Sequence, residues 1–227
     1  MTTLSYLELL GTLGHELRRP LTVVRGAATM LLSSPPDTSE AYRVQMLELI
    51  DRSAVAMSDL IEDLITVCHL EAGDLVLDAE QLEVSQIIDP VVEGARLQAR
   101  QQPRPILVLG SNPGLVVHAD AERAIQALRA LVANAIAFSP PGSRVEISVR
   151  PEPSRVRFEV LDRGPGIPAA EREAIFQPFH RLDRGAGGAG LGLHLARGVV
   201  RAMGGDAGLK SRPGGGSIFW FTLSRRA

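Results

Sequence analysis

Apolar residues in the first third of the chain recur with the period of α-helices. One run extends from Leu4 to Leu32, contains Pro20, which should kink the helix, and places an apolar residue at every seventh position from Leu10 to Leu31. A second run, from about Ser39 to Glu71, alternates spacings of three and four along a seam that consists of Leu47, Ile50, Ala54, Met57, Ile61, Leu64 and Cys68. Two long helices joined by the turn at 34–38 predict an antiparallel hairpin. A lone hairpin buries only one seam per helix, so we expect a homodimer through residues 1–71, built as a four-helix bundle.

Beyond Gly73 the pattern changes to short alternating runs between shorter helices. Strands are expected at 75–77, 106–109, 144–150, 155–162, 207–211 and 217–223, and helices at 85–100, 120–138 and 190–203, with Asp120 capping the second helix. Because strands and helices do not alternate regularly, the fold class is an α+β two-layer sandwich rather than a doubly wound sheet. The predicted domains are an all-α hairpin at 1–72 and this α+β domain at 73–227.

Composition and charge exclude several classes of protein. The 227 residues are 45% hydrophobic and 22% charged, which is enough to build a core, and the net charge of −2 disfavours binding of nucleic acid. The single cysteine, Cys68, excludes an internal disulfide and suits a reducing compartment. No apolar run approaches the roughly 20 residues of a membrane-spanning helix. We expect this stretch to be cytoplasmic, and, because no sensor domain precedes the hairpin, we expect a longer native protein anchored in the inner membrane.

Lysine is almost absent, and this excludes two kinds of ATP site. Lys210 is the only lysine, and it follows Leu209 rather than a glycine-rich loop. A P-loop needs a Gly-Lys-Ser/Thr sequence, and a eukaryotic-type protein kinase needs a lysine upstream of its catalytic loop. If the chain binds ATP, it does so without a P-loop and without the lysine of a eukaryotic-type protein kinase.

His15 lies on the polar side of the first predicted helix. At 100° per residue it falls about 160° around the helix from Leu17, on the opposite side from the apolar seam. Most histidines on helices are core or ordinary surface residues, but this geometry excludes the core. An exposed neutral imidazole is a nucleophile at pH 7, and Glu16 follows it directly. Arg19 stands where a zinc HExxH motif needs its second histidine.

Two glycine-rich loops and one asparagine suggest a nucleotide site. The loop at 162–168 follows a strand, and Asp162 at its start could accept a hydrogen bond from an exocyclic amine, although a tight turn with a capping aspartate remains an alternative. The loop at 185–190 precedes a helix, whose N-terminus suits phosphate. Asn134 lies within an apolar helical run, either as a packing residue or as an oxygen ligand of Mg²⁺.

Taken in order, these motifs resemble the catalytic core of a bacterial sensor histidine kinase over nearly the whole chain. The segment from His15 to Leu21 resembles the phosphoacceptor part of the dimerisation and histidine-phosphotransfer hairpin. The remainder resembles the ATP-binding domain shared by gyrase, Hsp90, histidine kinases and MutL. Its asparagine motif corresponds to Asn134, its first glycine motif to 162–166, its phenylalanine motif to 176–179, its second glycine motif to 188–193 and its closing glycine turn to 214–217.

The resemblance implies a role for each site residue. His15 would accept the γ-phosphoryl group of ATP with Glu16 as general base, and Arg181 would stabilise that group during transfer. Asn134 would ligate Mg²⁺, and Asp162 would read the adenine amino group. The remaining nucleotide-binding residues would be Gly164, Gly166, Gly188, Gly190, Leu191 and Gly192. The implied partners are a second copy and the receiver domain of a response regulator, whose aspartate takes the phosphoryl group from His15.

Three residues depart from the family pattern. Ala130 stands where a second asparagine is common, and Ala137 stands where a lysine or arginine usually touches phosphate. Arg19 replaces a threonine or asparagine that is associated with phosphatase activity. The alternative function is therefore a pseudokinase, a dimeric interaction module that binds nucleotide weakly. An ATPase clamp of the gyrase or Hsp90 type is disfavoured because it leaves the exposed pair of His15 and Glu16 unexplained.

Overall fold

The computed structural model describes residues 3–35, 37–98, 105–110, 114–182 and 190–225. The chain divides into two compact units, Met1–Cys68 and His69–Ala227. Within the described ranges, no helix combines the length and the apolar character needed to cross a membrane. The expected domain boundary between residues 72 and 73 stays a prediction.

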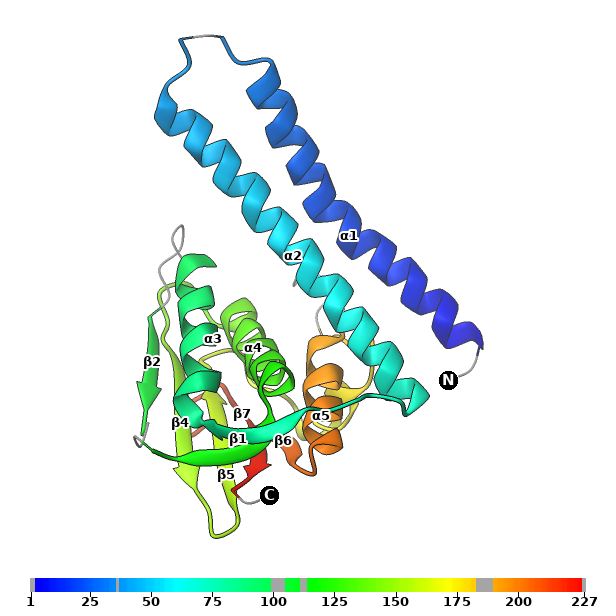
Figure 1. The fold of residues 1–227 in the computed structure, drawn as a ribbon, viewed down its shortest axis with the longest axis vertical. Helices are drawn as coiled ribbons and strands as arrows, with labels where there is room; N and C mark the ends of the chain where they lie inside the picture. The colour runs from blue at the N-terminus through cyan, green and yellow to red at the C-terminus, as the bar shows by residue number, and fades with distance from the viewer. Residues whose placement is uncertain (1–2, 36, 99–104, 111–113, 183–189, 226–227) are drawn as a thin grey trace. The chain divides into compact units, whose positions relative to one another are not determined.

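The first unit is formed by two long antiparallel helices (Figure 1). Helix α1 spans Thr3–Leu32 and continues through Pro20, and α2 spans Glu40–Ala72, so its last turn belongs to the second unit. The connecting turn is closed locally, because the Thr38 hydroxyl donates to the Pro35 carbonyl at 2.7 Å and the Tyr42 amide donates to the Ser39 hydroxyl at 3.3 Å. Ser39 thus caps the start of α2, a position at which serine is among the preferred residues.

The predicted seam of α2 is unevenly buried in the single chain. Ile50, Met57 and Leu64 are half-buried, whereas Leu47, Ala54 and Ile61 are exposed. We call these last three residues the outer row of α2. Val44 and Ile65 are exposed beside it. The helix therefore presents apolar side chains to solvent along one line.

The second unit contains a seven-stranded sheet in the order β1-β3-β7-β5-β4-β2, and β6 pairs with β7 along the edge opposite β5. The strands are β1 (Ala79–Glu83), β2 (Ile106–Leu109), β3 (Val116–Asp120), β4 (Val145–Pro151), β5 (Arg155–Leu161), β6 (Asp206–Ser211) and β7 (Ser217–Ser224). All pairs are antiparallel except that of β2 with β4. The predicted α+β class is confirmed, and the β4–β5 and β6–β7 hairpins lie where alternation placed them.

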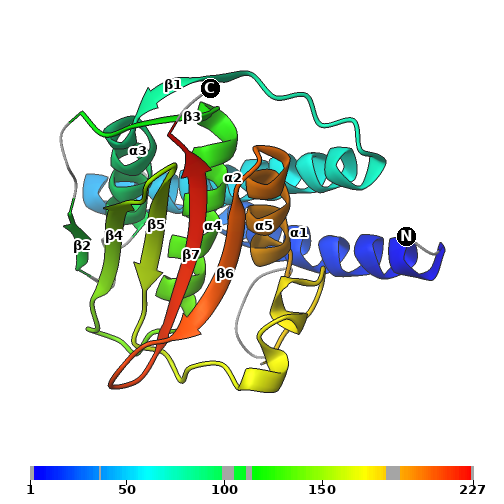
Figure 2. The same cartoon turned by 90° about the horizontal axis from the view of Figure 1, so that it is seen from below.

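Three helices cover one face of this sheet (Figure 2). They are α3 (Val84–Gln98), α4 (Ala121–Phe138) and α5 (Gly192–Ala202). The predicted cap of α4 is present, because Asp120 accepts a hydrogen bond from the Arg123 amide at 3.0 Å. Phe158 and Phe221 stack in the core with ring centroids 4.7 Å apart, and both are fully buried.

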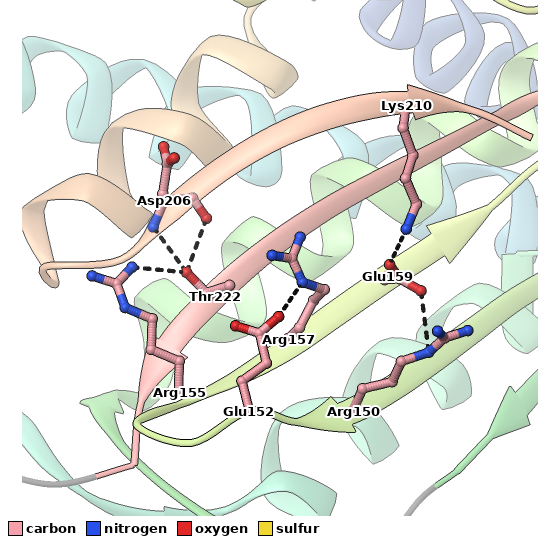
Figure 3. Close-up of polar contacts among 8 residues, drawn as sticks. All are labelled: Arg150, Glu152, Arg155, Arg157, Glu159, Asp206, Lys210 and Thr222. Atoms are coloured by element: carbon pink, nitrogen blue, oxygen red, sulfur yellow. Dashed lines mark hydrogen bonds and ion pairs between the residues drawn. The ribbon is translucent and has the colours of Figure 1, made fainter.

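The opposite face of the sheet is lined by charged side chains. Strand β5 alternates buried apolar residues with Arg155, Arg157 and Glu159 on this face. Glu159 is 1% exposed and contacts Lys210 Nζ at 2.7 Å and Arg150 Nε at 3.5 Å, from opposite sides (Figure 3). The face without helices therefore holds a buried carboxylate between two cations whose own side chains are at least half exposed.

Two elements differ from the expectation. The predicted strand at 75–77 is an extended connection, and Val76 is 86% exposed. Pairing of β1 with β3 begins only at Ala79. The preceding residue, Asp78, donates its amide hydrogen to Asp120 Oδ2 at 2.9 Å. Strand β3 was not predicted, because its five residues include a histidine and an aspartate and offer little alternation.

Candidate nucleotide site and phosphoacceptor

Asp162 lies directly after β5 and is 3% exposed. Its Oδ1 accepts hydrogen bonds from the Gly164 amide at 2.8 Å and from the Ser217 amide at 3.0 Å. Among the described residues, Oδ2 accepts no hydrogen bond, so one carboxylate oxygen is fixed and the other remains for a ligand donor. Burial raises the pKa of Asp162 above its usual range, and the two amides and the Arg212 guanidinium partly oppose this rise.

The glycines around Asp162 are required by close backbone contacts. A side chain at Gly216, which has φ of +95°, would place its Cβ 2.2 Å from the Asp162 carbonyl oxygen. At Gly164 a Cβ would lie 3.0 Å from the Phe138 carbonyl oxygen, at the end of α4. Gly166 adopts φ of +77°, which other residues rarely tolerate. The first glycine motif and the closing glycine turn thus meet at Asp162.

Helix α4 contributes Asn134 as a half-buried residue whose amide makes no hydrogen bond within the described part of the chain. Its carbonyl oxygen is a suitable ligand for Mg²⁺, which takes oxygen ligands and usually shares them with substrate phosphates and water. The described residues contain no group of three or more histidine, cysteine, aspartate or glutamate side chains that could hold a metal ion alone. A cation at Asn134 would therefore need further oxygen ligands, such as those of a triphosphate and of water.

The N-terminus of α5 lies beside α4 and close to the phenylalanine motif. A Cβ at Gly192 would lie 3.6 Å from Ala130 Cβ, and the Phe179 amide donates to the Gly190 carbonyl at 2.9 Å. Phe179 has φ of +63°, an uncommon conformation for a residue other than glycine. A Cβ at Gly190 would lie 3.2 Å from Arg181 Cγ, so Arg181 lies at this same helix start. The first turn of α5 leaves backbone N–H groups available to an anion.

Most of the predicted nucleotide-binding residues thus lie on three neighbouring segments, which are α4, the loop after β5 and the start of α5. Leu191 is buried and precedes the first turn of α5. Gly188 lies outside the described residues. The residues that depart from the family pattern lie on α4, where Ala130 is half-buried and Ala137 is exposed.

The predicted phosphoacceptor lies in the first unit, on α1. His15 is exposed, as its position opposite the apolar seam predicted, and Glu16 is half-buried. Arg19 is exposed, one turn further along α1. The imidazole is therefore accessible from solvent.

Two residues near Asp162 were missed from the sequence. Arg212 donates from Nη1 to the Asp162 carbonyl at 3.1 Å, and the Ser139 hydroxyl accepts from the Arg163 amide at 3.3 Å. Neither stands at a position with a recognisable signal, because both reach the site through tertiary contacts.

Two protein-family models match the chain, one in each unit. The family described as His Kinase A (phospho-acceptor) domain matches residues 5–73, and the family described as Histidine kinase-, DNA gyrase B-, and HSP90-like ATPase matches residues 119–227. The two families correspond to the two parts expected from the motifs.

Individual proteins show the same similarity. Sensor protein DivL of Caulobacter vibrioides is 33% identical over 93% of this chain and 27% of its own length, and adaptive-response sensory kinase SasA of a Synechococcus strain is 33% identical over 95% and 58%. The solved structure of the Acinetobacter baumannii histidine kinase AdeS matches with 27% identity and a TM-score of 0.64, over 94% of this chain and 98% of that chain. The structure of full-length ShkA in complex with AMPPNP matches with 30% identity and a TM-score of 0.67, over 95% and 45%.

The chain spans 27 to 30% of the length of the first four curated relatives. The two family models span the segments that contain His15 and Asp162. The chain therefore belongs to the sensor histidine kinases, as a catalytic core that consists of a phosphoacceptor hairpin and an ATPase domain.

Proposed function

We propose that this core transfers the γ-phosphoryl group of MgATP to His15 and then to an aspartate of a response-regulator receiver domain. The observation that carries the proposal is the exposure of His15 on a chain whose other unit has an ATPase fold. An ATPase that only hydrolyses ATP would have no use for an accessible imidazole followed by a carboxylate.

The nucleotide would be held by the residues around Asp162. Oδ2 of Asp162 would accept from the adenine amino group, and the N–H groups at the start of α5 would bind phosphate. Asn134 would ligate Mg²⁺, which neutralises triphosphate charge when it is bound. Arg181 would stabilise negative charge on the phosphoryl group during transfer.

The transfer step conserves atoms and charge. A ring nitrogen of His15 attacks the γ-phosphorus, the N–P bond forms, and the bond from phosphorus to the β,γ-bridging oxygen breaks to release ADP. Glu16 accepts the proton from the other ring nitrogen as general base. In the second step a receiver carboxylate attacks the phosphorus, and the N–P bond breaks to restore the imidazole.

We also propose that the core acts as a homodimer through residues 1–71. The outer row of α2, together with exposed Val44 and Ile65, is an apolar line that a second copy would bury in a four-helix bundle.

Incubation with γ-labelled ATP and Mg²⁺ tests the kinase proposal. We expect acid-labile and alkali-stable label on the chain, and none on His15→Gln. The alternative is the pseudokinase, which the alanines at 130 and 137 favour. Bound ATP without any label on the unaltered chain would support that alternative.

A further inference from the structure

Arg212 occupies the turn between β6 and β7 and is buried, with 9% of its surface exposed. One end of its guanidinium, Nη2, lies 2.8 Å from Glu146 Oε1, and the other, Nη1, donates to the Asp162 carbonyl at 3.1 Å. Glu146 on β4 is the register partner of Leu161, the residue before Asp162. The guanidinium thus links the backbone at Asp162 to the neighbouring strand.

The backbone of the same turn also closes on Asp162. The Arg212 amide donates to the Gly216 carbonyl at 3.1 Å, and the Gly215 amide donates to the Arg212 carbonyl at 3.1 Å. The turn then delivers the Ser217 amide to Asp162 Oδ1, while the Asp162 amide donates to the Ser217 carbonyl at 3.0 Å. Arg212 therefore fixes both the turn that orients the carboxylate and the carbonyl of the same residue.

We propose that Arg212, held by Glu146, is a positioning residue that fixes Asp162 for recognition of the adenine amino group and sets the preference for ATP over GTP. The proposal rests on the nucleotide-binding role proposed above for Asp162. Arg212 is not expected to touch the nucleotide, because both bonds of its guanidinium go to protein groups.

Chemistry supports arginine at this position. A planar guanidinium can donate to two acceptors in fixed directions, whereas a lysine ammonium supplies charge without that geometry. The positive charge also lowers the pKa of Asp162 against the effect of burial. Removal of this charge should therefore raise the pKa of Asp162 further, so that the carboxylate is protonated at a higher pH.

The test measures binding of ATP and GTP to the full chain by calorimetry between pH 5 and 8, with Mg²⁺ present. For Arg212→Met we expect ATP affinity to fall about three- to tenfold with less change for GTP, and the loss of affinity on acidification to begin at higher pH. Arg212→Lys should restore the pH profile but only part of the affinity. Glu146→Gln should weaken ATP binding less than Arg212→Met does. The control Arg150→Met should change neither the ATP affinity nor its pH profile. ATP ionises identically in every measurement, so differences between variants come from the protein.

The outcomes separate this inference from the proposed site. If Asp162→Asn loses ATP affinity but Arg212→Met binds ATP with unchanged affinity and an unchanged pH profile, the inference about Arg212 is wrong and the site at Asp162 stands. A general loss of ATP and GTP binding, with a lower melting temperature and an unmoved pH profile, would also overturn it, since a merely structural arginine would behave so. If Arg212→Met does not fold, Arg212→Lys and Glu146→Gln are compared with the unaltered chain, and unchanged selectivity and pH profile in both variants would contradict the proposal. Unchanged ATP affinity in Asp162→Asn would contradict the proposed nucleotide site itself.

Discussion

At the scale of single residues, Asp162 combines burial with an incomplete set of hydrogen bonds. Its folded-state pKa is raised, so a proton binds more tightly to the folded than to the unfolded chain. The free energy of unfolding therefore declines as the pH rises from the ordinary aspartate pKa through the folded-state value. Above the folded-state pKa, the charged carboxylate lowers the free energy of unfolding relative to a carboxylate with the ordinary pKa.

Asp162→Asn should separate binding from stability. We expect ATP binding to weaken by about 1.5–3 kcal/mol, because a charge-assisted hydrogen bond to the adenine amine is lost. GTP binding should weaken less, since guanine offers a carbonyl at that position. The free energy of unfolding at pH 7 should not fall. Calorimetry and urea denaturation measure the two effects, and unchanged ATP affinity would remove Asp162 from the site.

Arg19 leads to a prediction about the fate of the phosphorylated regulator. It is exposed, about 40° around α1 from His15 and one turn later, on the face where a receiver domain would dock. Arginine has no acceptor oxygen with which to position an attacking water, but it can pair with a phosphoryl group. We expect this core to phosphorylate its regulator well and to dephosphorylate it poorly.

Decay of the purified phosphorylated regulator, with and without the core and ADP, tests this expectation. Arg19→Thr should accelerate the decay. Fast decay that depends on the unaltered core, with no further acceleration in Arg19→Thr, would contradict it.

At the scale of elements, the helices and hairpins could be predicted because their signals are local. Asp120 marked the start of α4, and alternation marked β4 and β5. The apolar run at 75–77 led to a wrong strand prediction, because a short apolar run does not show whether a neighbouring strand is available to pair. In the site, Asp162 and the glycines followed from the motifs. Arg212 could not, because it lies 50 residues from Asp162 and 66 from Glu146 in sequence.

The charged face of the sheet provides a stability test. Lys210→Met removes the ammonium 2.7 Å from Glu159 and leaves this buried carboxylate with Arg150 at 3.5 Å (Figure 3). We expect the free energy of unfolding to fall by about 1–3 kcal/mol in urea denaturation, because a buried charge loses a partner. The same change in a Glu159→Leu background is the control and should cost less. An equal cost in both backgrounds would show that the ion pair does not stabilise the sheet.

At the scale of the whole molecule, the exposed apolar line on α2 predicts self-association. Ile61→Asp places a charge in the outer row and should convert the dimer to monomers, as measured by sedimentation equilibrium. Gln45→Asp is the matched control, because Gln45 is exposed about 200° around α2 from Leu47 and should leave the dimer intact. A dimer that persists in Ile61→Asp, or a wild-type chain that is monomeric at micromolar concentration, would contradict the proposed bundle.

The central claim is that the two units act on one phosphoryl group, with nucleotide held at Asp162 and phosphate received by His15. Peptide mapping of the chain after parallel incubation with α-labelled and γ-labelled ATP tests it most directly. We predict that label from the γ-position alone reaches the peptide containing His15, that Asp162→Asn slows its appearance, and that Glu16→Gln slows it without weakening ATP binding. Label on another residue, or label that persists in His15→Gln, would contradict the account.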